Sequence, residues 1–552
     1  MRGAFVACFG EVDQPALENA ADAYRWHSGD SEYHAAPRFH VAVERQAGDG
    51  PDVELRNGVT TVVHGDMRGS FADLQRQGGR FVVAESDGET LRAARDPMGL
   101  APLFFRIVGR GLWLATEVSP LLALGRPAPD LLALSAQAAL VPDDAQTGYV
   151  GIQRLLPGHV LHATRNLSVT QRPYWDPRGL FGRFRGSRRE AEDELWARLL
   201  EGVDRSLDGP TGILVSGGLD SAAVTAAAAR LGRPLSLVHV AFPEFADAAE
   251  EPYARAVADA AGAALEIVPG NAGSWDPQDD LDVSVIPYLS PPDYTASSGL
   301  GHLATRGLDA ALDGNDGDGV LGYRGREWGE LITTGKIPRL WELTRMYGAR
   351  SVAGGLARDL LPPAVHQTVR RIPPRASTYL EHIERYFAPP LRERIRSVDR
   401  ERWHQPVGEW RRRQLRQVSP VTTARMEEHE LRGARYGIDI RHPFADRDLV
   451  KFLVSLPAAI KSDPMRPKAL LCAALAGHAP DDVLERGEKP EYLSVLEHRV
   501  DRGRCLDWVK ESGVRLPLVN YEALFDDGIE SWGAPLFLLL LLARAHVFAA
   551  GG

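Results

Sequence analysis

The chain has 552 residues, of which 44% are hydrophobic and 25% are charged, and its formal net charge at pH 7 is −10. This length exceeds that of one ordinary domain, and the composition is that of a globular protein, so we expect two domains or a multi-part α/β enzyme. The negative net charge disfavours a general nucleic-acid-binding protein.

Cysteine use and the apolar runs indicate the compartment. Cys8, Cys472 and Cys505 are far apart and show no C-x-x-C spacing, which argues against a structural zinc site and fits a reducing cytoplasm. The N-terminus lacks the basic-then-apolar pattern of an export signal. The longest apolar run, Leu536–Ala543, is too short to span a bilayer and predicts a buried C-terminal helix. We therefore expect a cytoplasmic protein with no membrane span.

The first 175 or so residues are rich in short strand-like runs separated by Gly and Asp turns. These runs are Phe39–Val43, Val59–His64, Phe81–Glu85, Leu112–Ala115 and Val160–Ala163. They predict a layered β-sheet domain. Residues 176–188 are rich in Gly and Arg and predict a linker.

From Arg189 onward the pattern alternates between helix and strand. A strand at Gly212–Val215 is followed by a helix over Ala222–Leu231, and a second strand at Pro234–Phe242 is followed by a helix over Glu251–Ala261. This alternation predicts a parallel, doubly wound α/β sheet, in which ligands bind at the carboxyl ends of the strands.

The turn after the first of these strands, Ser216–Ser221 (SGGLDS), predicts an anion-binding site. Two glycines let backbone N–H groups approach phosphate oxygens, and the start of a helix adds partial positive charge. Asp220 would repel a bare phosphate, which favours Mg²⁺ between this carboxylate and a pyrophosphate group. The turn has no lysine of the Walker type. The alternative is a Gly-rich turn of any α/β domain.

SGGLDS resembles the pyrophosphate loop of the asparagine synthetase family, whose enzymes cleave ATP to AMP and pyrophosphate. The resemblance implies ATP as cosubstrate and a set of nucleotide-binding positions in and beside this loop. They are Leu214, Ser216, Gly217, Gly218, Leu219, Asp220 and Ser221, with backbone near His239 and Val240 against adenine. We expect the His239 side chain itself to have a structural and not a catalytic role, since it is a lone histidine in an apolar strand.

The first domain resembles the amidotransferase-like domain of the same family, in residues 79–81, 94–105, 115–118, 151–159 and 174–175. A working glutaminase of that type has cysteine after the initiator Met, where this chain has Arg2. Cys8 lies in an apolar strand-like run and reads as a core thiol. We therefore expect an Ntn-type domain that has lost glutamine hydrolysis, so that an amine other than ammonia is the nucleophile.

The domain limits that follow are a degenerate glutaminase-like domain over 1–175, a linker over 176–188, and an asparagine synthetase-like ATP-pyrophosphatase domain over 189–552. The fold class is therefore α+β in the first half and doubly wound α/β in the second.

A second signature, residues 310–323, resembles the family pattern S-G-x-G-x-D-E-x-x-x-G-Y. The resemblance implies that Asp318 is the second Mg²⁺ ligand beside Asp220, with Gly314 and Asn315 at the nucleotide. Gly319 departs from the usual Glu, and Asn315 stands where asparagine synthetases have Glu and β-lactam synthetases have a Tyr tied to substrate activation. The alternative is a Gly/Asp-rich turn without a ligand.

Two later signatures supply catalytic candidates. Residues 425–446 resemble the family's E-x-R-x-P-F-L-D helix pair, which implies a catalytic carboxylate at Glu427, with Glu430 as the alternate. Residues 486–492 resemble R-x-x-K-x-x-F, which implies that Lys489 stabilises negative charge during formation and breakdown of an acyl-adenylate. The alternatives are a helix-surface glutamate and a solvated lysine. The general base stays open.

Residues 392–417 carry many arginines with Trp403 and Trp410 between them. They could steer an acidic peptide or pyrophosphate, or form an ordinary solvated helix face.

Taken together, the missing cysteine and the altered loop at position 315 resemble lasso peptide cyclases most. The resemblance implies ATP- and Mg²⁺-dependent closure of a macrolactam between the N-terminal amine of a precursor peptide and an Asp or Glu side chain. It also implies two partners, a leader-binding protein and a leader peptidase. The alternatives are a β-lactam synthetase-like ligase acting on a small β-amino acid, and a catalytically silent scaffold.

Overall fold

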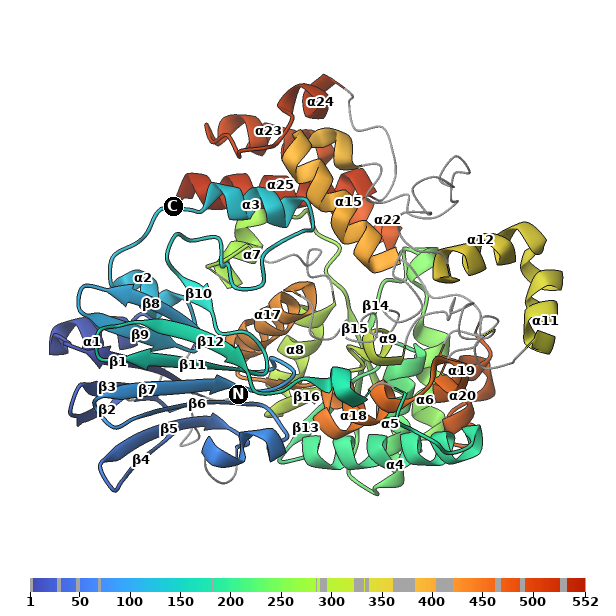
Figure 1. Cartoon of the computed structure of the whole chain (residues 1–552). Coiled ribbons are helices and arrows are strands. Elements are labelled where there is room, and N and C mark those ends of the chain that lie inside the picture. The colour runs from blue at the N-terminus through green and yellow to red at the C-terminus, as the bar shows by residue number, and fades with distance from the viewer. Residues whose placement is uncertain are drawn as a thin grey trace.

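The computed structural model describes residues 3–26, 31–45, 50–67, 71–180, 182–283, 285–287, 295–321, 332, 337–360, 383–403, 420–461, 468–486, 492–526 and 534–551. It contains two antiparallel sheets, one parallel sheet and helices around them (Figure 1). The predicted fold class is confirmed: layered sheets come first and a doubly wound α/β domain follows.

The first half is a sandwich of two six-stranded sheets. One sheet has the order β10 (Gln153–Arg154), β8 (Phe104–Val108), β9 (Gly111–Ala115), β1 (Ala4–Gly10), β3 (Phe39–Glu44) and β2 (Ser31–Ala36). The other has the order β12 (Val169–Pro173), β11 (His159–Thr164), β7 (Thr90–Arg95), β6 (Phe81–Ser86), β5 (Val59–Gly65) and β4 (Asp52–Arg56). All five predicted strands of this half are present.

Alternation along β1 explains how the sandwich is buried on both sides. Phe5, Ala7 and Phe9 point between the sheets, while Val6 and Cys8 point to the outer face, under α1 (Gln14–Ala21) and α2 (Ser119–Ala123). Cys8 is fully buried, and burial raises the pKa of its thiol to about 12. The prediction of a core thiol is therefore confirmed.

The second half is built on a parallel sheet of order β15-β14-β13-β16-β17. The strands are β15 (Leu265–Pro269), β14 (Ser236–Ala241), β13 (Thr211–Leu214), β16 (Ala310–Leu312) and β17 (Asp439–Arg441). The strand order reverses between β13 and β16, so the crevice at the carboxyl ends of these two strands is where such sheets bind ligands.

Helices cover both faces of the parallel sheet. One face carries α4 (Arg188–Ser206), α5 (Leu219–Arg230), α6 (Glu251–Ala260), α18 (Arg447–Ser455) and α20 (Ala469–Ala474), and the other carries α8 (Ala296–Thr305) and α17 (Pro420–Tyr436). Shorter helices α9 (Gly317–Leu321), α19 (Ala458–Lys461) and α21 (Asp481–Leu484) complete this half. Figure 1 shows α17 between the sandwich and the parallel sheet.

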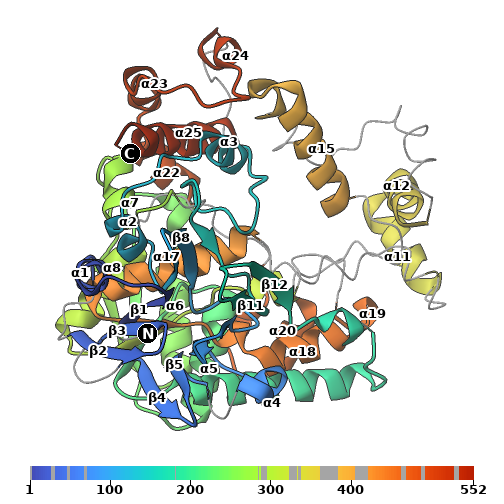
Figure 2. The same ribbon diagram turned by 60° about the vertical axis from the view of Figure 1, so that its left-hand side comes forward.

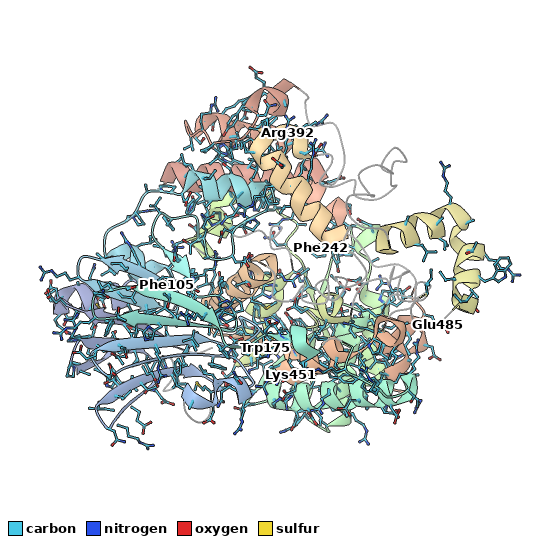
Figure 3. The ribbon with its side chains drawn as sticks, viewed as in Figure 1. Phe105, Trp175, Phe242, Arg392, Lys451 and Glu485 are labelled. Carbon is cyan, nitrogen blue, oxygen red and sulfur yellow. The ribbon has the colours of Figure 1, made fainter. Side chains whose placement is uncertain are left out.

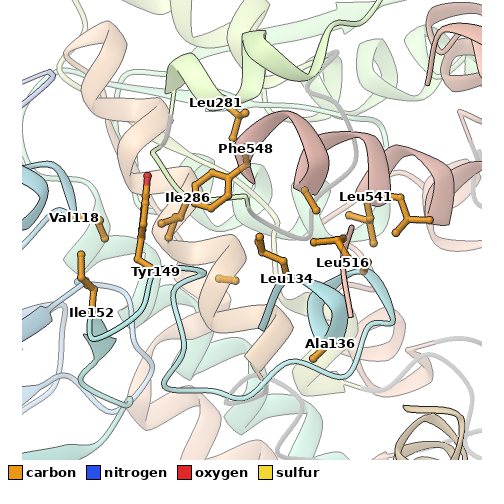
Figure 4. Close-up of a cluster of buried hydrophobic side chains, with 14 of the residues drawn as sticks. Val118, Leu134, Ala136, Tyr149, Ile152, Leu281, Ile286, Leu516, Leu541 and Phe548 are labelled. Atoms are coloured by element: carbon orange, nitrogen blue, oxygen red, sulfur yellow. The ribbon is translucent and has the colours of Figure 1, made fainter. Parts of the chain in front are cut away.

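A third set of helices joins the two halves through apolar packing. It comprises α3 (Leu131–Ala138), α7 (Pro277–Val283), α22 (Leu493–Arg499), α23 (Arg502–Glu511) and α25 (Ala534–Gly551). Figure 4 shows Leu134 and Tyr149 of the first half among Leu541 and Phe548 of α25, and the rings of Tyr149 and Phe548 lie 4.9 Å apart. The predicted buried C-terminal helix is confirmed.

The remaining described helices lie on the side away from the sandwich. They are α11 (Ile337–Tyr347), α12 (Ala349–Leu360), α15 (Pro389–Trp403) and α24 (Tyr521–Asp526). In Figures 1 and 2, α11 and α12 project from the body as a pair. Only the first part of the Arg/Trp-rich segment 392–417 is described. There Arg396 pairs with Glu384 at 2.8 Å, and Arg392 (Figure 3) donates to the Phe387 carbonyl.

The junction of the halves is described except for residue 181. β12 ends at Pro173, and Trp175 lies where the halves meet (Figure 3). Ser187 then caps α4 in a capping box with Glu190. The limits 1–175, 176–188 and 189–552 stay predictions. No helix in the described ranges is both long and apolar enough to cross a membrane.

Candidate nucleotide and metal site

The turn between β13 and α5 is held in shape by its own serines. Ser216 N donates to Ser221 Oγ at 3.2 Å, and the two hydroxyl oxygens lie 3.1 Å apart. Gly218 N donates to Ser216 Oγ at 3.3 Å. The predicted anion-binding turn therefore stands at the N-terminus of a twelve-residue helix, α5.

Gly217 is required by the close approach of α6. Its φ is +76°, and a Cβ there would lie 2.8 Å from Glu250 O and 2.9 Å from Ala254 N. Only glycine combines this backbone conformation with this contact. Arg486 packs over the ring of Tyr253 beside this point and pairs with Glu250 at 3.0 Å.

The loop after β16 packs directly on the first turn of α5. A Cβ on Gly314 would lie 2.7 Å from Ser221 N, and a Cβ on Gly317 would lie 2.4 Å from Asp220 Cγ. Two glycines thus let the second signature approach the first. This approach brings the loop that carries Asp318 alongside Asp220.

Asp220 and Asp318 converge on the ammonium group of Lys468. Lys468 Nζ contacts Asp220 Oδ2 and lies 2.7 Å from Asp318 Oδ1. Lys468 has a left-handed backbone with φ 49°, and only 7% of its side chain is exposed. Two carboxylates that come from the first turns of separate helices and share one positive centre have the donor chemistry of a Mg²⁺ site. Their role as metal ligands stays a prediction.

His239, Leu214 and Val240 lie at the carboxyl ends of β13 and β14. His239 is buried, and its Nδ1 lies 2.8 Å from Val215 O, so it anchors the residue before the turn. Leu214 and Val240 pack toward Gly299 of α8, where a Cβ would lie 2.8 Å from Leu214 Cδ2. Their predicted proximity to adenine is not tested.

Asp313, the first residue after β16, forms a buried network with two histidines. His442 Nδ1 lies 2.7 Å from Asp313 Oδ1, and His429 Nδ1 lies 4.0 Å from Asp313 Oδ2. Burial lowers the pKa of His429 to about 3. Burial alone would lower the pKa of His442, but the Asp313 carboxylate outweighs it and raises that pKa.

These three side chains have the composition of a metal site, yet Asp313 and His442 already satisfy each other by a hydrogen bond. The positive charges of Arg425, near His429, and of Arg80, near His442, would oppose a further cation. We therefore treat the network as a support of the loop that follows β16.

Glu427 and Glu430 do not lie beside Asp220 or Lys468 in any described contact. Glu427 is fully buried, and its two oxygens pair with Arg95 at 3.0 Å and Arg154 at 2.7 Å. Glu430 pairs with Arg80 at 2.9 Å. Since both carboxylates bind arginines of the first domain, their contacts are those of an interdomain interface. Their predicted catalytic role stays untested.

Lys489 lies outside the described residues. The nearest described residues on either side are Arg486, which donates to Gly217 O at 3.4 Å, and Tyr492, whose Oη lies 2.5 Å from Glu250 Oε2. Arg486 and Tyr492 therefore both contact residues at the SGGLDS turn or at Glu250, whose carbonyl packs on Gly217.

Several residues near the site were missed from the sequence. Glu250 carries no motif signal, Asp316 and Arg425 lie within signatures that assign them no role, and Lys468 lies beyond residue 446, where the third signature ends. Asn315 lies against Asp313, to which its N–H donates at 3.1 Å. Runs of charge at helix spacing are too common to single out such partners without the fold.

Comparison with known protein families decides the class. Residues 195–530, more than half of the chain, match the asparagine synthase family, and residues 67–175 match a glutamine amidotransferase domain. The chain belongs to the asparagine synthase family. That assignment supports an ATP-dependent carbon–nitrogen ligase.

Two fungal proteins are similar to parts of this asparagine synthase family member. Amidase chyE of Penicillium rubens is 35% identical over 182 residues, which cover 32% of this chain and 25% of that protein. Amidase chry2 of Gibberella zeae is 30% identical over 229 residues, which cover 38% and 32%. The chain thus spans about a quarter to a third of the length of these curated relatives.

Two solved structures are similar to this chain only at low sequence identity and low TM-score. One titled as the allosteric regulatory enzyme of purine biosynthesis has a TM-score of 0.24 and 11% identity, and covers 54% of this chain and 83% of its own. Glutamine phosphoribosylpyrophosphate amidotransferase from B. subtilis has a TM-score of 0.23 and 10% identity, and covers 56% and 90%. Neither score supports an argument.

Proposed function

We propose that this protein is an ATP- and Mg²⁺-dependent ligase of the lasso peptide cyclase type. It would activate an Asp or Glu side chain of a precursor peptide and join it to the peptide's N-terminal amine. The observation that carries the proposal is the convergence of Asp220 and Asp318 at the switch point of the parallel sheet, beside the N-terminus of α5.

Different residues of the site would bind the pyrophosphate group, hold Mg²⁺ and stabilise negative charge. The N–H groups of the SGGLDS turn and the start of α5 would bind the pyrophosphate part of ATP. Asp220 and Asp318 would hold Mg²⁺, which when bound supplies charge neutralisation at the phosphates. Lys489 would stabilise negative charge near the reacting carboxyl group. The identity of the general base stays open.

The proposed reaction balances in two steps. A carboxylate oxygen attacks the α-phosphorus of ATP and pyrophosphate leaves. The peptide amine then attacks the activated carbonyl, the bond to AMP breaks, and the amine loses a proton. The protein's part would be to hold the two peptide groups together and keep water away from the activated carbonyl.

The cysteines support a nucleophile other than ammonia. Cys8, Cys472 and Cys505 are all buried, and burial raises the pKa of both Cys8 and Cys505 to about 12. A reactive cysteine needs an accessible thiolate, which none of them offers. The amine must then come with the substrate. A cytoplasmic location, a leader-binding protein and a leader peptidase belong to the same proposal.

The test is mass spectrometry of a leaderless candidate peptide incubated with the protein, ATP and Mg²⁺, with Asp220→Ala as the control variant. We expect the peptide to lose one water, AMP to form, and the variant to be inactive. AMP without dehydration of the peptide would move the substrate toward a small β-amino acid.

Two other outcomes would overturn the proposal. Absence of AMP with every carboxylate tested, with the partner proteins present, would favour a silent scaffold. Cleavage of an amide without ATP would instead favour the amidase activity named for the fungal relatives.

A further inference from the structure

The buried carboxylate of Glu427 ties the first domain to α17. Arg95, at the end of β7, is fully buried and donates to Glu427, to Leu155 O at 3.0 Å and to Gly99 O at 2.8 Å. Arg154, on β10, donates through its Nε to the other carboxylate oxygen of Glu427 at 2.7 Å. Because Arg95 is also fixed to two carbonyls of its own domain, Glu427 is held against a rigid support.

The opposite side of α17 faces the candidate site. Arg425 and His429 are four residues apart and share one side of the helix, whereas Glu427 lies two residues from each and about 200° around the axis. Arg425 Nη2 lies 2.5 Å from Asp316 Oδ1, and His429 lies near Asp313. One helix therefore contacts the first domain and the loop after β16 at the same level.

The contact with Asp316 bears on the shape of that loop. Asp316 has a φ of +71°, a conformation that a residue other than glycine keeps only where its surroundings hold it. Gly317, the next residue, is the one packed against the Asp220 carboxylate, and Asp318 follows it. A shift of Arg425 would therefore move the residues that bring Asp318 to Asp220.

We infer that Arg95 and Arg154 are positioning residues for the nucleotide and metal site, and that they act through Glu427 and α17. The amidotransferase-like domain would then serve the ligase half as the support that fixes the loop 313–318. The inference rests on the proposed function in one respect, that this loop takes part in binding MgATP.

The experiment compares Glu427→Gln with Phe548→Leu. The first keeps the side-chain shape and removes the charge that the two arginines bind. The second is the matched control, because Phe548 packs on Tyr149 across the same two domains and takes no part in the ion pairs between Glu427 and the two arginines. The readouts are the melting temperature, the Kd of a fluorescent ATP analogue with Mg²⁺, and hydrogen exchange of a peptide covering 313–321.

We expect Glu427→Gln to raise that Kd roughly tenfold and to speed exchange over 313–321, as typical coupling energies between sites allow. Phe548→Leu should lower the melting temperature and leave both other readouts within about twofold. If Glu427→Gln lowers only the melting temperature, the interface is merely structural and the inference is wrong.

A substitute variant and the binding result for wild-type protein cover the remaining outcomes. Should Glu427→Gln fail to fold, Arg154→Lys keeps the charge, alters the Nε contact and is measured in the same way. If wild-type protein binds the analogue but forms no AMP, the proposed function fails and the inference still stands on Kd and exchange. If it binds no analogue, exchange over 313–321 alone decides the inference.

Discussion

Lys468 is the residue on which the charge balance of the candidate site depends. Its buried ammonium group pairs with both Asp220, which is mostly buried, and Asp318, whose side chain is 42% exposed. Removing one member of a buried ion pair typically costs about 3–5 kcal/mol, because the remaining charges stay buried. The two carboxylates would then attract any divalent cation supplied to them.

We therefore expect Lys468→Met to melt several degrees lower than wild type in EDTA, and to bind Mn²⁺ without nucleotide more tightly than wild type does. Calorimetric scans with EDTA and Mn²⁺ titration followed by electron paramagnetic resonance would measure both. Equal melting temperatures in EDTA would show that Lys468 does not balance these carboxylates.

His429 predicts a specific dependence of stability on pH. The folded protein keeps its pKa at about 3, well below the ordinary value near 6.5, because the ring is buried beside His442 and Arg425. Between these two values the unfolded chain binds a proton that the folded chain does not. The free energy of unfolding must then fall as pH decreases, by up to about 1.4 kcal/mol per pH unit.

The measurement is chemical denaturation of wild type and His429→Gln from pH 4.5 to 6.5. Both proteins retain His442, whose pKa the Asp313 carboxylate raises, and Asp313, whose pKa His442 lowers, so the comparison isolates the contribution of His429. We expect the difference in stability between the two proteins to shift in favour of the variant as pH falls. A difference that does not change with pH would contradict the buried, neutral His429.

At the scale of elements, the site is made by the contact between the first turn of α5 and the start of α9. Gly317→Ala would place a Cβ about where the Asp220 carboxylate lies. Since Lys468 also holds that carboxylate, the side chain cannot turn away without leaving its partner. We expect pyrophosphate release to fall at least roughly tenfold, while the chain still folds.

The control is Gly232→Ala at the far end of α5. Its φ is +68° and no atom lies within 4 Å of the added Cβ, so backbone strain of about 1 kcal/mol is the only expected effect. A small drop in melting temperature with unchanged pyrophosphate release would fit. Equal activities of the two alanine variants would show that the close packing at Gly317 is not needed.

At the scale of the whole molecule, an amidotransferase-like sandwich is attached to a ligase by an ionic and an apolar interface. The ionic interface joins three arginines of the sandwich to α17, and the apolar interface joins α3 to α25. Cys8 is fully buried in the sandwich, on the face of β1 that α1 and α2 cover. The sandwich therefore has the architecture of a glutaminase without an available thiol.

We expect the full chain to release no glutamate from glutamine, with or without ATP, and Cys8→Ala to leave ATP-dependent AMP formation unchanged. An enzyme-coupled glutamate assay measures the first and nucleotide chromatography the second. Glutamate release that disappears in Cys8→Ala would refute the loss of glutaminase function.

Local patterns determined the elements of this protein. Alternating apolar residues produced the strands of the sandwich, and the strand–turn–helix pattern around SGGLDS produced β13 and α5, because period and turn chemistry are properties of neighbouring residues. The same local motifs indicated the class of reaction and named Asp220 and Asp318. The positions of charged residues along the chain did not indicate which of them form ion pairs.

Only the tertiary structure decided which charged residues form ion pairs. Asp220 and Lys468 are 248 residues apart, and Arg95 and Glu427 are 332 apart. The sequence predicted a catalytic carboxylate at Glu427, but only the packing of α17 between two domains showed that arginines of the sandwich bind it. Long-range ion pairs depend on which helix faces approach each other, and that is settled by burial of the apolar surfaces around them.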